Sequence, residues 1–250
     1  MRLIDAFKIR KGDLVALAGA GGKTSAMFAL GREGVARGLK VVLTTTTKIY
    51  FPKDLAGLVV MAEGPELVDL VRQGLGRDKL LVAGAGLDRG GEKLAGISAD
   101  LTGLFLEAGA DLVLVEADGA AGRPFKAPRE GEPVIPAAAT LVVPVVGVDC
   151  LGRPLIDEYV HRPEVVAALS GTEIGREVSP EVVAAVLLHP RGYRKGLPPG
   201  SRWVPFINKV ENGEDLHKAR RLAEMLGRGG AGRVVIGTAR AGQPVEVVVF

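Results

Sequence analysis

Cysteine is almost absent from this chain, and long apolar runs are missing altogether. The single cysteine, Cys150, excludes an intrachain disulfide framework and a zinc site built from several cysteines. No window reaches the roughly 18 apolar residues of a membrane span, and the charged amino terminus lacks the apolar core of a signal peptide. We therefore expect a cytoplasmic protein that does not associate with membranes.

A strong excess of charge of one sign is also missing. The 250 residues include 32 Lys and Arg against 29 Asp and Glu, which gives a net charge of +3. The arginines are dispersed rather than gathered in a tract, so the sequence does not indicate nucleic-acid binding and favours small anionic ligands. With 47% hydrophobic residues and no repeat, the chain is expected to form one domain over residues 1–250.

Apolar runs alternate with amphipathic segments along most of the chain. This alternation predicts an α/β fold, a mostly parallel sheet with helices on both faces. Strands are expected at Leu14–Ala18, Lys40–Leu43, Leu58–Met61, Leu80–Ala83, Leu112–Val115, Leu141–Val146, Val204–Ile207 and Arg233–Ile236. Helices are expected at Lys23–Arg37, Pro65–Gly74, Ala99–Ala108 after a capping Ser98, and Gly213–Leu226.

Three segments depart from this rhythm. Residues 151–203 carry two expected helices, Pro163–Ser170 and Pro180–Leu188, and are interpreted as a helical insertion or lid over the carboxyl edge of the sheet. The glycine-rich stretch Gly84–Gly96 is expected to be a loop. A turn at Gly242–Pro244 should lead into a last strand at Val245–Phe250, which is antiparallel at one edge of the sheet.

The segment LVALAGAGGKTS has the character of a phosphate-binding loop between a buried strand and a helix. Its spacing is compact, because the standard motif would need glycine where the chain has Leu17, and it resembles the loop of Mur ligases and folylpolyglutamate synthetases. A ligand-free glycine turn is the alternative. Lys23 is expected to meet the outer phosphates and Thr24 a magnesium ion, within a nucleotide site formed by Gly19, Ala20, Gly21, Gly22, Lys23, Thr24 and Ser25.

Ligands of open parallel sheets collect at the carboxyl ends of the strands. After the second strand, four threonines and Lys48 leave the sheet. Thr45 and Thr46 are candidates for a role at the γ-phosphate, and Lys48 is expected to neutralise its charge. A run of threonines extending a strand into water is the alternative.

The apolar run Leu112–Val115 leads directly to two carboxylates, in the form of a Walker B strand end. We assign Glu116 to the metal and Asp118 to the γ-phosphate or the nucleophile, while the order of the two stays open. Asp118 followed by glycine is also an ordinary turn signal. Arg123 and Lys126 add positive charge suited to a phosphate or an anionic second substrate.

The sequence Asn208-Lys209-Val210-Glu211 resembles the base-reading signature of GTP-binding proteins. Glu211 stands where that signature has aspartate, so GTP is suggested and ATP stays open. Thr238 and Ala239 follow the next strand, where such folds complete the base pocket, and an ordinary turn is an equally good interpretation of this segment.

Two segments of the insertion, Val160–Glu164 and His189–Gly196, combine histidines with arginines and are interpreted as a basic lid. His161 and His189 are too far apart in sequence to suggest a metal pair, and the cluster Arg191–Lys195 could face an anion or solvent. Cys150 is interpreted as a buried, inert thiol.

Seven segments together resemble one family, the selenium-dependent molybdenum hydroxylase accessory proteins of the YqeC type. They lie between Leu14 and about Ala239 and read GAGGKTS, TTTTKI, LVEADGAAGRPFKAP, PVVGVDCLGRPL, VHRPE, LLHPRGYRKGLP and INKVE. The resemblance implies a role in maturing a selenium-dependent molybdenum hydroxylase, with that hydroxylase or its selenium and molybdopterin cofactor as partner.

Residues and resemblance lead to three hypotheses. The first is a cytoplasmic P-loop NTP hydrolase that uses Mg²⁺ with ATP or GTP in hydroxylase maturation. The second is a small-molecule kinase or ATP-dependent ligase with a compact Mur-type loop. The third is a nucleotide-switched chaperone or regulator of the hydroxylase.

Overall fold

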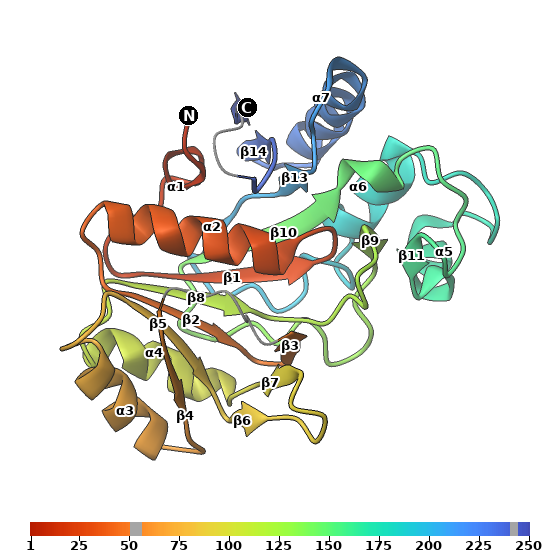
Figure 1. The fold of residues 1–250 in the computed structure, drawn as a ribbon. Coiled ribbons are helices and arrows are strands. Elements are labelled where there is room, and N and C mark those ends of the chain that lie inside the picture. The colour runs from red at the N-terminus through yellow and green to blue at the C-terminus, as the bar shows by residue number, and fades with distance from the viewer. Residues whose placement is uncertain (51–56, 241–244) are drawn as a thin grey trace.

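The computed structural model describes residues 1–50, 57–240 and 245–250. Its centre is a twisted sheet whose strand order is β15-β14-β13-β10-β1-β8-β2-β5-β4, with β12 paired to β10 (Figure 1). Neighbouring strands are parallel except for β14 and β15. The strands are β1 (Asp13–Gly19), β2 (Val41–Thr45), β4 (Leu58–Met61), β5 (Leu80–Gly84), β8 (Leu112–Glu116), β10 (Leu141–Gly147), β12 (Arg202–Trp203), β13 (Phe206–Asn208), β14 (Arg233–Ile236) and β15 (Glu246–Val249).

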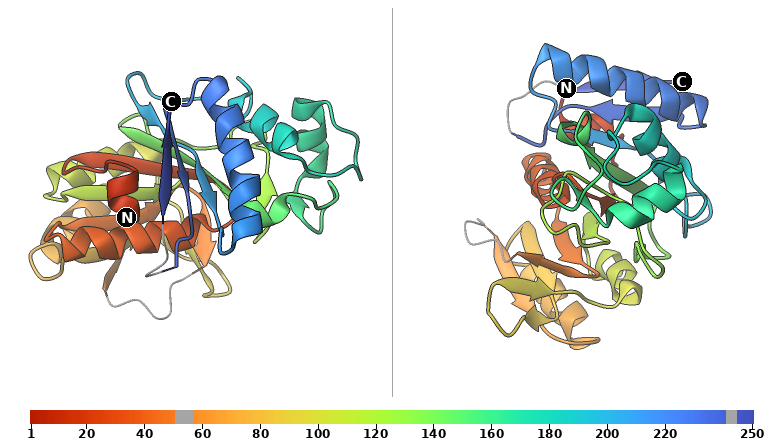
Figure 2. Two further views of the ribbon diagram at one scale, coloured as in Figure 1. Left: turned by 90° about the horizontal axis from the view of Figure 1, so that it is seen from above. Right: turned by 90° about the vertical axis from the view of Figure 1, so that its right-hand side faces the viewer.

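Helices cover both faces of this sheet. Helices α1 and α2 pack on one face, and α3 to α7 lie on the other, so the strands between them are buried on both sides (Figures 1 and 2). Every residue of β1 is buried, which explains why the strand is apolar after its first residue, Asp13. The described helices are α1 (Leu3–Ala6), α2 (Lys23–Ala36), α3 (Glu66–Gly74), α4 (Ala99–Glu107), α5 (Pro163–Ser170), α6 (Pro180–Leu188) and α7 (Gly213–Arg228).

Two small sheets flank the carboxyl edge of the main one. The first has the antiparallel order β3-β7-β6, with β3 at Lys48–Tyr50, β6 at Gly86–Leu87 and β7 at Lys93–Ala95. The second pairs β9 (Phe125–Lys126) with β11 (Val160–His161) in parallel and joins the insertion to the segment after β8. Both therefore place additional walls beside the strand ends.

The predicted α/β class with a mostly parallel sheet is confirmed. The antiparallel strand at one edge is also confirmed, while the turn predicted at Gly242–Pro244 lies mostly outside the described residues. The prediction of a loop over Gly84–Gly96 was wrong, because β6 and β7 pair there and Leu94 is fully buried. Ser98 stands before α4 but its side chain accepts no capping hydrogen bond, whereas Ser179 accepts one from Val182 N.

The segment 151–203 folds as β11, α5, α6 and β12, and α6 packs against both α5 and α7. The interpretation of this segment as a lid stays a prediction. Within the described ranges, each helix is too short or too polar to cross a bilayer.

Candidate phosphate and metal site

The loop between β1 and α2 is shaped by glycine. Gly21 and Gly22 have φ of 79° and 110°, in the left-handed region that favours glycine. A Cβ on Gly21 would lie 2.1 Å from the amide nitrogen of Gly147, so no other residue fits without moving β10. The compact spacing of the motif is therefore matched by close backbone packing.

The N–H groups of this loop divide into two sets. Gly19 donates to Asp118, Ala20 to the carbonyl of Val145 and Gly21 to that of Arg123. The first intrahelical bond of α2 runs from Ala26 to Gly22, which leaves the preceding N–H groups without intrahelical partners. The donors available to an anion therefore come from the start of α2, and Ala20 and Gly21 contribute the shape of the loop.

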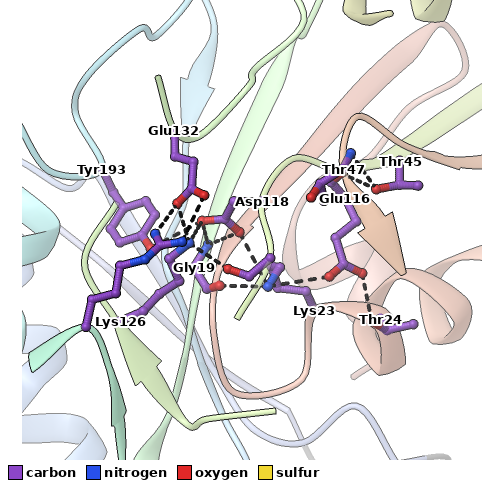
Figure 3. A network of polar contacts seen from close by, with 12 residues as sticks. Gly19, Lys23, Thr24, Thr45, Thr47, Glu116, Asp118, Lys126, Glu132 and Tyr193 are labelled. Atoms are coloured by element: carbon purple, nitrogen blue, oxygen red, sulfur yellow. Dashed lines mark hydrogen bonds and ion pairs between the residues drawn. The ribbon is translucent and has the colours of Figure 1, made fainter. Parts of the chain in front are cut away.

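Lys23 lies at the centre of the site. Its Nζ donates to the carbonyl oxygen of Gly19 at 2.7 Å and lies 3.4 Å from a carboxylate oxygen of both Glu116 and Asp118 (Figure 3). The side chain is 3% exposed. A buried ammonium between two carboxylates is held in one position, at the edge of the pocket described below.

Thr24 and Glu116 form a pair of oxygen donors beside this lysine. The Thr24 hydroxyl donates to Glu116 Oε2 at 2.7 Å. Burial raises the pKa of Glu116, and the charge of Lys23 and the hydrogen bond from Thr24 oppose that rise. A hydroxyl and a carboxylate are hard ligands of the kind that Mg²⁺ takes alongside phosphate oxygens and water. The donor set therefore fits Mg²⁺.

A second carboxylate, Asp118, joins the loop to the insertion. It is fully buried and accepts from Gly19 N at 2.9 Å, from Lys126 Nζ at 3.1 Å and from the Tyr193 hydroxyl at 3.4 Å. Lys126 also contacts Glu132 at 2.8 Å, and Figure 3 shows the polar contacts running without interruption from Tyr193 to Thr24. Asp118 is thus a structural junction as well as a candidate for catalysis.

Glu132 collects cations that sequence reasoning did not connect. Arg162 Nη1 lies 2.7 Å and Arg129 Nε 3.2 Å from its oxygens. Partial burial acts to raise the pKa of Glu132, but the hydrogen bonds from Arg162 and Lys126 outweigh it and lower the pKa to about 2. No pattern around Glu132 pointed to this role, and Arg162 was expected only as part of a basic lid, without a partner.

The threonine run is used mainly for structure. Thr47 and Lys48 line the pocket, whereas the three preceding hydroxyls bond to main-chain carbonyls. These bonds run from Thr44 to Ala83 at 2.8 Å, from Thr45 to Glu116 at 2.9 Å and from Thr46 to Val134 at 3.0 Å. The predicted roles of Thr45 and Thr46 at a γ-phosphate would require these bonds to change, and Thr47 is the better placed hydroxyl.

The predicted base-reading segment touches the loop directly. Asn208 Nδ2 donates to the carbonyl of Gly21 at 2.7 Å, and its Oδ1 accepts from Ala239 N at 2.9 Å. Lys209 follows with a φ of 66° and forms an ion pair with Asp149 at 2.7 Å. Asn208 therefore ties the phosphate loop to the segment after β14.

Glu211 lies further from the loop and is paired with a cation. Arg240 contacts it at 3.0 Å on the surface, and the buried Thr238 hydroxyl accepts from Arg240 N at 3.4 Å. A guanine ring would have to compete with Arg240 for this carboxylate. The base that fits here stays open.

The rest of the predicted basic lid lies elsewhere. Arg194 stacks over Trp203 at 4.2 Å, and Lys195 donates to the carbonyl of Arg129. His161 does line the pocket, and burial together with nearby cations lowers its pKa. Burial raises the pKa of the Cys150 thiol far above its usual range, which agrees with an inert side chain.

A pocket of about 560 Å³ lies at the carboxyl edge of the sheet, lined by residues of the phosphate loop, the strand ends and the insertion. One wall is the start of α2, a second is β3 with Lys93, and a third holds Arg129, His161 and Arg162. Within the described residues, no group of three or more His, Cys, Asp and Glu could hold a metal ion. A metal here would have to complete its shell with oxygens of a ligand.

Comparison with known proteins gives a consistent match. The model of the YqeC protein family matches residues 15–164, which include the phosphate loop, Glu116 at the end of β8, Asp118 after it, and Arg162. The uncharacterized protein YqeC of Escherichia coli (strain K12) is 30% identical over 225 residues, covering 90% of this chain and 86% of the relative.

Proposed function

The chain belongs to the YqeC family, as its sequence predicts, and we propose that it is a P-loop protein that binds a nucleoside triphosphate with Mg²⁺ and hydrolyses it. Water would accept the γ-phosphoryl group, and the nucleoside diphosphate would be the leaving group. The arrangement of Lys23, Thr24 and Glu116 carries this proposal. A buried lysine at the start of a helix, beside a hydroxyl paired with a strand-end carboxylate, is the donor set for a magnesium triphosphate.

Each residue has a definite part in this scheme. The N–H groups at the start of α2 and Lys23 would bind the outer phosphates, and Thr24 and Glu116 would hold the metal. Bound Mg²⁺ would neutralise charge on the phosphate oxygens. Asp118 holds Gly19 and Lys23 in place. In this scheme the chain acts mainly by positioning the phosphates and by stabilising their charge.

The biological role follows the resemblance. We propose that this activity takes place in the cytoplasm and serves the maturation of a selenium-dependent molybdenum hydroxylase. The hydroxylase itself or its selenium and molybdopterin cofactor would be the partner. ATP and GTP are both retained as candidate nucleotides. Asn208 is bonded to main-chain groups of Gly21 and Ala239, and Glu211 is paired with Arg240, so neither contact selects a base.

A second activity, transfer of the phosphoryl group to a small acid, is favoured by one observation. The pocket extends past Lys23 to cations on β3 and the insertion, where an acceptor could bind. Product analysis separates the two activities, since hydrolysis releases inorganic phosphate and transfer labels the acceptor.

Titration calorimetry with Mg·ATP and Mg·GTP tests the proposed site. Lys23→Ala should abolish binding, because it removes the buried ammonium group at the start of α2 that would contact the outer phosphates. Thr24→Val keeps the volume and charge and should weaken binding in Mg²⁺ more than in EDTA. Lys11→Ala is the matched control, because Lys11 is an exposed lysine that pairs with Asp111 away from the pocket. Unchanged affinity in a folded Lys23→Ala protein would refute the proposal.

A further inference from the structure

The pocket contains more positive charge than a magnesium triphosphate needs. Seven lysine and arginine side chains line it, against the two carboxylates Glu116 and Glu132. Asp118 and Asp149 contact Lys23 and Lys209, and the buried Lys126 adds one more cation, so the net charge of the site is about +4. A triphosphate carries about four negative charges and its metal returns two, so about two positive charges stay uncompensated. Concave sites of one sign concentrate ions of the opposite sign. The surplus therefore indicates a further anion in the same pocket.

Part of this positive charge lies on the wall away from the base-reading segment. Glu132 gathers Arg129 and Arg162 there, and Lys126 beneath it is fully buried. One carboxylate thus orders the two pocket-lining guanidinium groups before any ligand binds. Each guanidinium has five N–H donors, so both keep donors beyond those used on Glu132.

Backbone conformation singles out the same pocket independently. Four non-glycine residues of the described chain have positive φ, and three of them, Ala121, Arg162 and Lys209, line this pocket. Arg162 has φ 63° and ψ 65° immediately before α5. Such conformations are unfavourable for residues with a Cβ and are concentrated at sites where a ligand is held. Arg162 is therefore held in a costly conformation at the rim of the pocket.

We propose that Arg129 and Arg162 form a second binding site, which takes a small oxyanion, a carboxylate or a phosphate monoester, beside the bound nucleotide. The proposal deepens the proposed function, because it assigns the chemical class of the second ligand of the same pocket. Glu132 is the positioning residue of this site, and the planar guanidinium groups suit bidentate contact with either oxyanion.

The experiment uses the full chain with its phosphate loop filled by Mg²⁺ and a non-hydrolysable imidodiphosphate analogue of ATP or GTP. Malonate and glycerol 3-phosphate are then titrated separately, which distinguishes carboxylate from phosphate. Saturable binding of at least one probe is expected, and Arg162→Gln should weaken it about 10-fold or more. Arg129→Gln removes a more exposed partner and tests the site without disturbing the start of α5.

Arg176→Gln is the matched control, because Arg176 is an exposed arginine of the insertion that pairs with Glu173 and does not line the pocket. Its probe affinity should equal that of the unmodified chain. Failure of both probes on analogue-loaded protein would overturn the second site and leave the proposed function standing. Displacement of the probe by the analogue would also overturn it, since the probe would then occupy the phosphate loop. If no analogue binds, the proposed function fails, and the probes are titrated into the nucleotide-free chain. Probe binding that is lost in Arg162→Gln then supports the second site, and probe binding that is unchanged in this variant overturns it.

Discussion

Replacing Lys126 by methionine should strongly destabilise the protein, although this residue lies outside the phosphate loop. Its ammonium is fully buried and contacts the Gly119 carbonyl at 2.6 Å, Glu132 at 2.8 Å and Asp118 at 3.1 Å. Methionine fills a similar volume and removes only the charge and the donors. Asp118 would then stay buried with far less compensation.

The expected loss follows from these contacts. Removing one partner of a buried ion pair costs about 3–5 kcal/mol. Glu132 keeps Arg129 and Arg162, so the lower figure of about 3 kcal/mol applies. At roughly 3 kcal/mol per molar urea, the unfolding midpoint should fall by about 1 M.

Urea unfolding followed by fluorescence of the single tryptophan, Trp203, measures this loss, with circular dichroism as a check on two-state behaviour. Lys218→Met is the control, because Lys218 forms an exposed pair with Glu214 and should change stability by at most about 0.5 kcal/mol. In a double-mutant cycle with Asp118→Asn, the paired loss should be smaller than the sum of the single losses by at least about 1 kcal/mol. Equal midpoints for Lys126→Met and Lys218→Met would refute the reasoning.

Two further predictions concern Asn208, which contacts the phosphate loop, and Glu132, which pairs with Lys126. Asn208→Ala leaves the Gly21 carbonyl and Ala239 N–H unpaired, so stability should fall by about 2–3 kcal/mol and nucleotide affinity with it; unchanged calorimetric affinity would contradict this. The pKa of Glu132 is about 2 in the folded chain and 4.5 in the unfolded reference, so its stabilisation is complete above pH 4.5 and is lost as the pH falls towards 2. Across that interval Glu132→Gln should lose less stability than the unmodified chain in urea titrations, and parallel losses would argue against the pairing.

The main sheet was predictable because its strands are buried on both faces. The runs at Leu58–Met61 and Arg233–Ile236 match β4 and β14 to the residue. The meeting of Lys23 with Glu116 also followed from sequence, since parallel strand ends share one edge.

Contacts between loops were not predictable in this way. Tyr193 contacts Asp118 from 75 residues away, and Arg162 contacts Glu132 from 30. All four residues lie outside the helices and strands, where no periodicity indicates which side chains meet. The short strands β3 and β7 have three residues each, too few for alternation to be recognised. Sequence patterns therefore located the centre of the site, while its wall emerged only from the folded chain.

The hydrogen bond between Asn208 and Gly21 has a consequence for the folding of the chain during its synthesis. The loop motif is complete once Ser25 has been synthesised, yet the side chain that holds the Gly21 carbonyl follows 187 residues after that glycine. At ribosomal rates of roughly 5–20 residues per second, this gap corresponds to roughly 10–40 s. A nascent chain would carry the complete motif throughout that interval without the contact that fixes its shape, so nucleotide capture would become a property of the finished polypeptide.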